Sequence, residues 1–211
     1  MNPMTSSSVI NALALAVLFA APTLIPQTRP AQQSSTQSRA PLILRVEPAA
    51  SSVHWTVDSS LLTVHGTFHL KRGSLTIDPA TGKASGEIVV DATSGESGND
   101  SRDHKMHNEV LESAKYSEIV FRPDRVEGTI AKQGTSNLTR HGTFSLHGAD
   151  HEFSAPVKAE LSADHFKGSS TISIPYIEWK LKNPSNFLLK VKPAVEVEVN
   201  LAGSIQGAGT H

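Results

Sequence analysis

One polar segment of this 211-residue chain carries the side chains best suited to chemistry. The segment "ESGNDSRDHKMHNEVLESAKY" (96–116) combines acidic and basic residues with two histidines. His104 and His107 are three residues apart, so on a helix both imidazoles could face one metal ion. Asp103 or Glu109 would then supply a further ligand. Because the chain has no cysteine and no H-E-x-x-H motif, the spacing favours two solvated histidines over a zinc site, and no cofactor is predicted.

A second set of ionisable residues belongs to the same segment. Asp91, Arg102 and Asp103 could form an acid–base cluster, or a hydrogen-bonded tie between the end of a strand and the start of a helix. Arginine pairs with carboxylates in a fixed bidentate geometry, which suits the tie. The sequence has no G-x-S-x-G nucleophile motif, and no serine stands out by its spacing to a histidine and an acid. We therefore predict that the protein is not an enzyme.

The apolar residues of the segment predict a short amphipathic helix. Met106, Val110 and Ala114 recur every four residues, which places them on one helical face. Asp100 or Ser101 is expected to cap the helix, because a side-chain oxygen at that position accepts a hydrogen bond from a free backbone N–H. The polar segment is thus predicted to interrupt a series of strands.

From Leu42 onward, apolar and polar residues alternate with a period of two, which is typical of half-buried strands. The clearest runs are "SVHWTVD" (52–58), "LTVHGTFHL" (62–70) and "AVEVEVNLAG" (194–203), and turn markers rich in glycine separate such runs. The pattern predicts an all-β protein of about eight strands with one short helix. Alternation alone is compatible with two stacked sheets and with one closed barrel, since each buries one face of every strand.

Several motifs resemble the YceI-like family. The block "DATSGESGNDSRD" (91–103) agrees with the family pattern D-x-x-S-x-x-x-G-N-x-x-R-D, and "SSVHWTVD" (51–58) with "GSLTID" (73–78) resembles its opening. "FSLHGADHEFSAPV" (144–157) resembles a later hairpin. The resemblance covers roughly residues 45 to 205. The residues that carry its central motif are Asp91, Ser94, Asn99, Arg102 and Asp103.

The sequence departs from the family pattern directly after this motif. The family usually has a His-Leu pair there, where this chain has Lys105 and Met106. A following aromatic pair is replaced by Val110 and Leu111. These differences concern contacts with a ligand rather than the fold.

The resemblance implies an extended, antiparallel, lipocalin-like β-barrel with an apolar cavity that binds an isoprenoid or another long-chain lipid. The polar segment would then form the strand-to-helix corner that closes one end of the barrel. Burial of about twenty methylene groups gives ~16 kcal/mol, of which association and ordering remove ~4–15 kcal/mol. An apolar tube therefore binds lipid without a catalytic group. The cavity candidates are Trp55, Val64, Phe68, Phe144, Phe153, Val195, Val197 and Val199.

The net charge and the composition of the N-terminal residues limit the possible partners and the cellular location. With 19 basic and 20 acidic residues, the chain has no charge signature of a nucleic-acid-binding protein. Residues 1–21 contain an apolar run of signal-peptide length and are predicted to be a signal peptide or N-terminal anchor. We expect residues 22–41 to form a disordered spacer and residues 42–211 to form the YceI-like domain. We expect a periplasmic or secreted protein, with membrane association through the N-terminal segment where it is not cleaved.

Two other functions stay open at this stage. One is a metal-dependent periplasmic enzyme that uses the region of His104 and His107. The other is a structural or stress-protective envelope protein without a ligand. The sequence carries no signal for an oligomeric state.

Overall fold

The computed structural model describes residues 40–206, in which nine strands form a single sheet. The predicted signal segment, and all of the spacer except residues 40 and 41, lie outside the described residues. The strands are β1 (Leu42–Val46), β2 (Ser52–Asp58), β3 (Thr63–Ile77), β4 (Ala84–Glu96), β5 (Glu118–Glu127), β6 (Gly134–Leu146), β7 (Ala149–Leu161), β8 (His165–Ile174) and β9 (Val195–Gln206). The helical segments are η1 (Pro48–Ala50), α1 (Asp100–Lys105) and the π-helix η2 (Met106–Val110).

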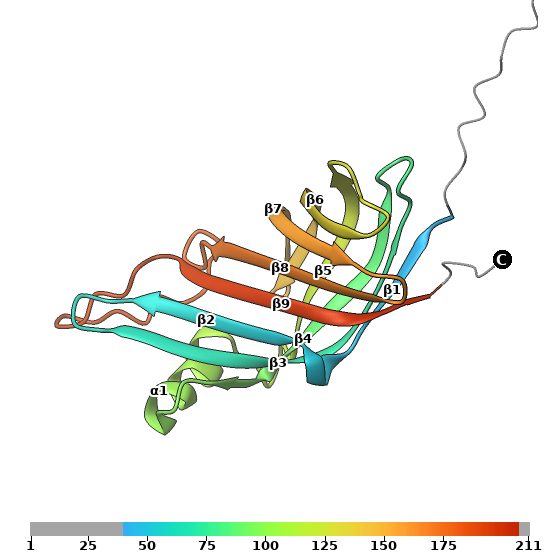
Figure 1. The fold of residues 1–211 in the computed structure, drawn as a ribbon. Coiled ribbons are helices and arrows are strands. Elements are labelled where there is room, and N and C mark those ends of the chain that lie inside the picture. The colour runs from blue at the N-terminus through green and yellow to red at the C-terminus, as the bar shows by residue number, and fades with distance from the viewer. Residues whose placement is uncertain (1–39, 207–211) are drawn as a thin grey trace, which may run out of the picture. The chain divides into compact units, whose positions relative to one another are not determined.

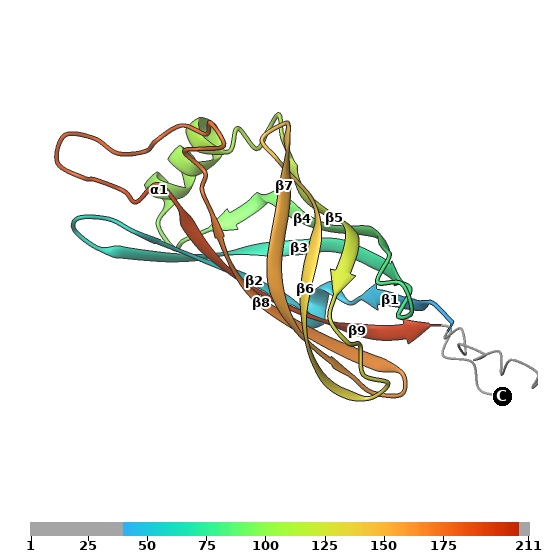
Figure 2. The ribbon, with the colours of Figure 1, turned by 90° about the horizontal axis from the view of Figure 1, so that it is seen from above.

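The sheet closes on itself, as Figures 1 and 2 show. The order β3-β2-β9-β8-β7-β6-β5-β4 returns to β3 because β3 also pairs with β4, and all pairs are antiparallel. This closure confirms the predicted antiparallel barrel and decides against two stacked sheets. A closed ring leaves no strand edge free within it.

Strands β1 and β2 occupy one position of the ring. Leu44 of β1 pairs with β3 and β9 at one end of the barrel, and Trp55 of β2 pairs with the same two strands farther along. Between them, Pro48 begins the turn of η1, where a residue without a backbone N–H is tolerated. The nine strands therefore fill eight positions, which matches the predicted number.

One end of the barrel is solid and the other is hollow. The solid end lies at β1 and holds the core residues Leu42, Leu44, Phe166 and Leu201. Along β9, Leu201 is buried in this core, whereas the valines at 195, 197 and 199 are only partly buried. At the solid end β1 and β9 approach closely at Gly203. A Cβ atom there would lie 1.9 Å from the carbonyl oxygen of Arg45. Only glycine fits there.

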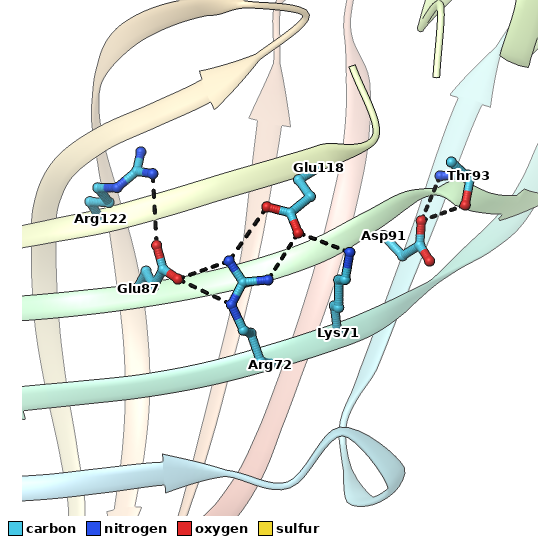
Figure 3. Close-up of polar contacts among 7 residues, drawn as sticks. All are labelled: Lys71, Arg72, Glu87, Asp91, Thr93, Glu118 and Arg122. Atoms are coloured by element: carbon cyan, nitrogen blue, oxygen red, sulfur yellow. Dashed lines mark hydrogen bonds and ion pairs between the residues drawn. The ribbon is translucent and has the colours of Figure 1, made fainter. Parts of the chain in front are cut away.

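A bulge in β3 organises charges on the outer face of the barrel, shown in Figure 3. The register shift beyond Leu70 leaves the consecutive residues Lys71 and Arg72 both exposed, and both reach Glu118 at 2.9 Å. Arg72 also contacts Glu87 at 3.0 Å. Hydrogen bonds from Arg72 and Lys71 lower the pKa of Glu118 to about 2. The ladder thus connects β3, β4 and β5.

The predicted helix is present, but its cap and its end differ from the prediction. Asn99, rather than Asp100 or Ser101, caps α1, and its side chain accepts a hydrogen bond from the backbone N–H of Arg102 at 3.0 Å. The second half is a π-helix that ends at Val110, so Ala114 is exposed and outside the helix. In residues 40–206, no helix is long and apolar enough to cross a membrane.

Candidate ligand-binding cavity

The hollow end of the barrel contains a cavity of about 500 Å³. Its mouth, which we define as residues 59–62, 99–111 and 184–191, is formed by the β2–β3 hairpin, the helical segment and the connection between β8 and β9. The inner faces of seven strands, which are β2, β3, β4, β5, β6, β8 and β9, make the wall, and nearly all of the wall is apolar. The apolar strand residues on it are Val53, Trp55, Val57, Val64, Phe68, Ile88, Val90, Ile119, Phe121, Phe144, Leu146, Ile172, Ile174, Val195, Val197 and Val199.

The structure brings most of the predicted cavity residues together. One candidate, Phe153 of β7, is misplaced, because it does not line the cavity. Its ring lies 5.5 Å from that of Phe144 and 6.4 Å from that of Phe121, so it packs against two wall residues. The predicted residues that do line the cavity are Trp55, Val64, Phe68, Phe144, Val195, Val197 and Val199.

The helical segment covers the mouth with its apolar face. Met106, Val110 and Leu111 line the cavity, and the first of these packs over Gly95 of β4. A Cβ atom at Gly95 would lie 2.8 Å from Cε of Met106 and 2.4 Å from the ring of Phe68. The absence of a side chain at this position therefore lets the helix approach the sheet. The polar segment of the sequence thus turns its apolar residues inward, and two of its cations, Arg102 and Lys105, also line the cavity at the mouth.

Ser97 holds the start of the helix to the end of β4 by hydrogen bonds. Arg102 donates from Nε to Ser97 Oγ at 2.7 Å and from Nη2 to the Ser97 carbonyl oxygen at 2.9 Å. Asp103 accepts from the backbone N–H of Ser97 at 3.0 Å and from its hydroxyl. Burial raises the pKa of Asp103, but the hydrogen bonds from Ser97 outweigh it and the pKa falls below its usual value. Sequence reasoning missed Ser97, which lies inside the motif but at a variable position of the pattern.

Asp91 takes no part in this tie, contrary to the prediction. Its carboxylate accepts from the backbone N–H of Thr93 at 2.9 Å and from the Thr93 hydroxyl at 2.6 Å, as Figure 3 shows. The hydroxyl of Thr93 holds the pKa of Asp91 below its usual range. Ser94 donates to the Asp91 carbonyl oxygen at 2.7 Å and accepts from the backbone N–H of His69 at 2.8 Å. Asp91 and Ser94 thus shape the irregular pairing of β4 with β3.

The two histidines have different environments. His107 is half-buried, with Nε2 2.7 Å from the Gly95 carbonyl oxygen and Nδ1 2.9 Å from Ser113 Oγ. The prediction that it is solvated is wrong, because both ring nitrogens hold the corner in place. His104 is exposed and lies beside Asn108. No three His, Asp or Glu side chains converge as metal ligands among residues 40–206.

Comparison with known proteins identifies the family of this chain. A family model for the YceI-like domain matches residues 44–203. The chain belongs to the YceI-like family. No curated protein matches the sequence.

Two solved structures resemble the YceI-like domain of this chain. The crystal structure of BcnA from Burkholderia cenocepacia has a TM-score of 0.61 at 15% identity, over 75% of this chain and 99% of that one. A polyisoprenoid-binding domain from Saccharophagus degradans, implicated in plant cell wall breakdown, has a TM-score of 0.58 at 18% identity, over 76% of this chain and 97% of that one. At these identities the likeness establishes the fold.

One cation lies on the apolar wall of this YceI-like cavity. Arg140 of β6 lines the cavity, and its guanidinium carbon lies 5.0 Å from the centre of the Phe121 ring. Burial lowers the pKa of Arg140 to about 10, so it is protonated at neutral pH. Sequence reasoning missed this residue, although it occupies the same strand phase as the buried Leu138 and the cavity residue Phe144. The signal in the sequence was a single charged residue among the apolar residues on the inward face of β6.

Proposed function

We propose that this YceI-like protein is an exported lipid-binding protein that holds an isoprenoid or another long-chain amphiphile in the barrel cavity. The observation that carries the proposal is the apolar wall of the roughly 500 Å³ cavity. An apolar chain in such a space leaves water and gains about 25 cal/mol for each Å² of apolar surface removed. The valines at 195, 197 and 199, which are only partly buried, would gain this contact.

The family supports the same ligand class. The Saccharophagus domain of similar fold is a polyisoprenoid-binding domain. Because that likeness rests on 18% identity, it favours the fold and the cavity rather than one particular lipid. The ligand proposed here is therefore a class, defined by a long apolar chain.

The side chains suited to acid–base chemistry favour binding over catalysis. Asp103 and His107 are occupied by hydrogen bonds within the corner, and Asp91 is bound to Thr93 outside it. Each of these groups therefore has a structural partner, and the cavity wall presents mainly hydrocarbon. The apolar run of residues 1–21 supports export to the periplasm or secretion as part of the proposal.

Native mass spectrometry of the full chain, purified from its own source, tests the proposal. We expect a lipid adduct that is stoichiometric with the protein and that organic solvent removes. The matched control is Val197→Asp, which places a carboxylate on the wall and should carry no adduct. The proposal fails if the wild-type protein carries no lipid and also binds neither added geranylgeraniol nor oleyl alcohol. Stoichiometric zinc, measured by elemental analysis of the same sample, would favour the metal-dependent alternative.

A further inference from the structure

Arg140 lies at the inner limit of the cavity. On β6, Phe144 and Arg140 line the cavity, whereas Leu138, two residues farther toward the solid end, is buried and does not. On β9 the same boundary falls between Val199, which lines the cavity, and Leu201, which belongs to the solid core. Arg140 is therefore the innermost residue of β6 on the cavity wall.

The charge of Arg140 has no counter-ion among the described residues. Within residues 40–206 its side chain makes no hydrogen bond and no ion pair, and its Nε is inaccessible to solvent. Its pairing neighbours in β5 and β7 are Val126 and Ala155, which are both buried and apolar. The ring of Phe121 gives only partial compensation. The half-buried guanidinium lines the cavity without a counter-ion, and a charge withdrawn from water without one is unfavourable, so the site is suited to an anion.

A second unsatisfied group on the wall is also a donor. Trp55 lines the cavity, and its indole Nε1 is buried without a hydrogen-bond partner among the described residues. An indole N–H and a guanidinium can only donate. Two side chains on this apolar wall, Trp55 and Arg140, therefore have a donor that lacks an acceptor within the described residues.

We propose that the ligand carries an anionic oxygen head group, a carboxylate or a phosphate, which binds Arg140 at the inner end while its apolar chain extends toward the mouth. The inference rests on the proposed function, since it assigns the head group of that same lipid. Arginine suits both anions, because its planar fork donates two parallel hydrogen bonds to a pair of oxygen atoms. The apolar wall between Arg140 and the mouth then covers the chain.

Matched ligand pairs that differ only in the head group test this inference on the full wild-type chain. One pair is geranylgeranyl phosphate and geranylgeraniol, and the other is oleic acid and oleyl alcohol. Affinity is measured by displacement of a fluorescent apolar dye. We expect the anion to bind ~10- to 100-fold tighter than the alcohol in at least one pair, because a charge-assisted hydrogen bond contributes about that factor. The pair that shows the preference distinguishes phosphate from carboxylate.

Two substitutions at the same position provide the controls. Arg140→Met keeps the length of the side chain and removes the charge, so it should abolish the preference while the alcohol still binds. Its melting temperature should equal or exceed that of the wild type, because a partly buried, unpaired charge is removed. Arg140→Lys should retain a weaker preference, since lysine lacks the fork. Equal affinity of the wild type for acid and alcohol would overturn the head-group assignment and leave the lipid-binding function intact. If no ligand of either pair binds, both fail.

A separate observation concerns the outside of the mouth. Four large apolar side chains are exposed there: Leu61 by 70%, Leu62 by 50%, Phe187 by 93% and Leu188 by 77%. They lie on the β2–β3 hairpin and on the β8–β9 connection, which Figures 1 and 2 show at the same end of the barrel. The two loops are joined, since the backbone N–H of Ser60 donates to the Lys190 carbonyl oxygen at 2.8 Å. We call these four residues the apolar tip.

The β8–β9 connection, which carries half of the apolar tip, is rich in lysine. The β8–β9 connection, residues 175–194, carries Lys180, Lys182, Lys190 and Lys192 and a single acid, Glu178. Lys182 and Lys192 are bound to Glu109 and Asp58, whereas Lys180 and Lys190 make no ion pair within residues 40–206. Exposed apolar side chains beside free lysines match the interface of a bilayer that contains anionic lipids.

We infer that the apolar tip docks the mouth of the cavity on an anionic lipid bilayer, so that a lipid can pass between membrane and barrel without crossing water. The test is flotation of the full chain with vesicles of phosphatidylcholine alone or with a third of phosphatidylglycerol. The double variant Phe187→Ser and Leu188→Ser should lose most of the binding, and Lys190→Glu should lose the dependence on phosphatidylglycerol. Any contribution of residues 1–39 is common to all of these proteins.

The control for the apolar tip is binding of geranylgeranyl phosphate without vesicles, which should not change because neither Phe187 nor Leu188 lines the cavity. Unchanged flotation of the double variant would overturn the docking inference. So would a wild-type dimer, seen by analytical ultracentrifugation, that the double variant converts to monomer, since a second copy would then be the partner of the apolar tip.

Discussion

The Nε2 atom of His107 lies 2.7 Å from the carbonyl oxygen of Gly95 and joins the helical segment to strand β4. Because a carbonyl oxygen can only accept, Nε2 donates, and Nδ1 is then free to accept from the buried Ser113 hydroxyl at 2.9 Å. One imidazole thus connects the helical segment, the turn that follows it and the sheet beneath it. The position of the helix over the cavity depends on this ring.

His107→Ala should loosen the helical segment more than the barrel. The substitution removes two hydrogen bonds and leaves a buried hydroxyl unsatisfied, which should lower the free energy of unfolding by ~1–3 kcal/mol. Hydrogen exchange should rise first in residues 100–113. The matched control is His104→Ala on the exposed face, which should stay within about ±0.5 kcal/mol. Equal effects of the two substitutions, or a fall in melting temperature on chelation, would contradict the structural role.

Arg102→Ala should act through Ser97 and not through Asp91. The two hydrogen bonds to Ser97 are lost, which should cost ~1–3 kcal/mol and raise exchange around α1. Ser97→Ala should have a similar effect, and the double variant should be less destabilised than the sum of the two. Asp91→Ala is the contrasting variant, because it should disturb β4 and leave exchange at α1 unchanged. Additive effects of Arg102→Ala and Ser97→Ala would contradict the tie.

Val197 distinguishes an open cavity from a filled core. Val197→Phe should be tolerated and should shorten the longest chain bound, whereas in a filled core it would cost ~1–3 kcal/mol. Val197→Asp should abolish lipid binding and lower stability, since it places a charge on the apolar wall. The adjacent exposed Glu198 is the control, and Glu198→Lys should stay within about ±0.5 kcal/mol. Chain length is measured with a series of prenols.

The ion pairs that connect β3, β4 and β5 should make the stability of the protein depend on pH. Hydrogen bonds from Arg72 and Lys71 lower the pKa of Glu118 from 4.5 to about 2. The stabilisation is therefore fully present above the unfolded pKa of 4.5, and it is lost as the pH falls toward 2. The difference in melting temperature between wild type and Glu118→Gln should shrink over this range and also with added salt, because the group is exposed. A difference that is constant from pH 7 to pH 2 would argue against the ladder.

Strands with a periodic alternation of apolar and polar residues could be predicted from the sequence. Contacts that depend on how the chain turns after a strand could not. The alternation in β9 places its valines on the inner face, since side chains of a strand alternate between its faces. The tie at Ser97 depends on how the chain turns after β4, where Asn99 takes the cap and the helix continues as a π-helix. Phe153 shares the inward phase of its strand, yet its ring packs against those of Phe144 and Phe121 and does not line the cavity. The strand phase predicts which face of the sheet a side chain occupies, but not whether the side chain reaches the cavity.

The shared position of β1 and β2 has a consequence for how the chain folds. Both strands lie between β3 and β9, so Ile43 pairs with Gln206 and Val53 pairs with Val199. These pairings connect residues about 150 apart in sequence, and neither can form until β9 has been synthesised. Chains with so many distant contacts fold in milliseconds to seconds, because a long loop must be closed before any contact repays its entropy. The nascent chain therefore stays open until its last strand arrives, and deletion of residues 195–206 would leave β1, β2 and β8 without a neighbour on one side and prevent cooperative folding.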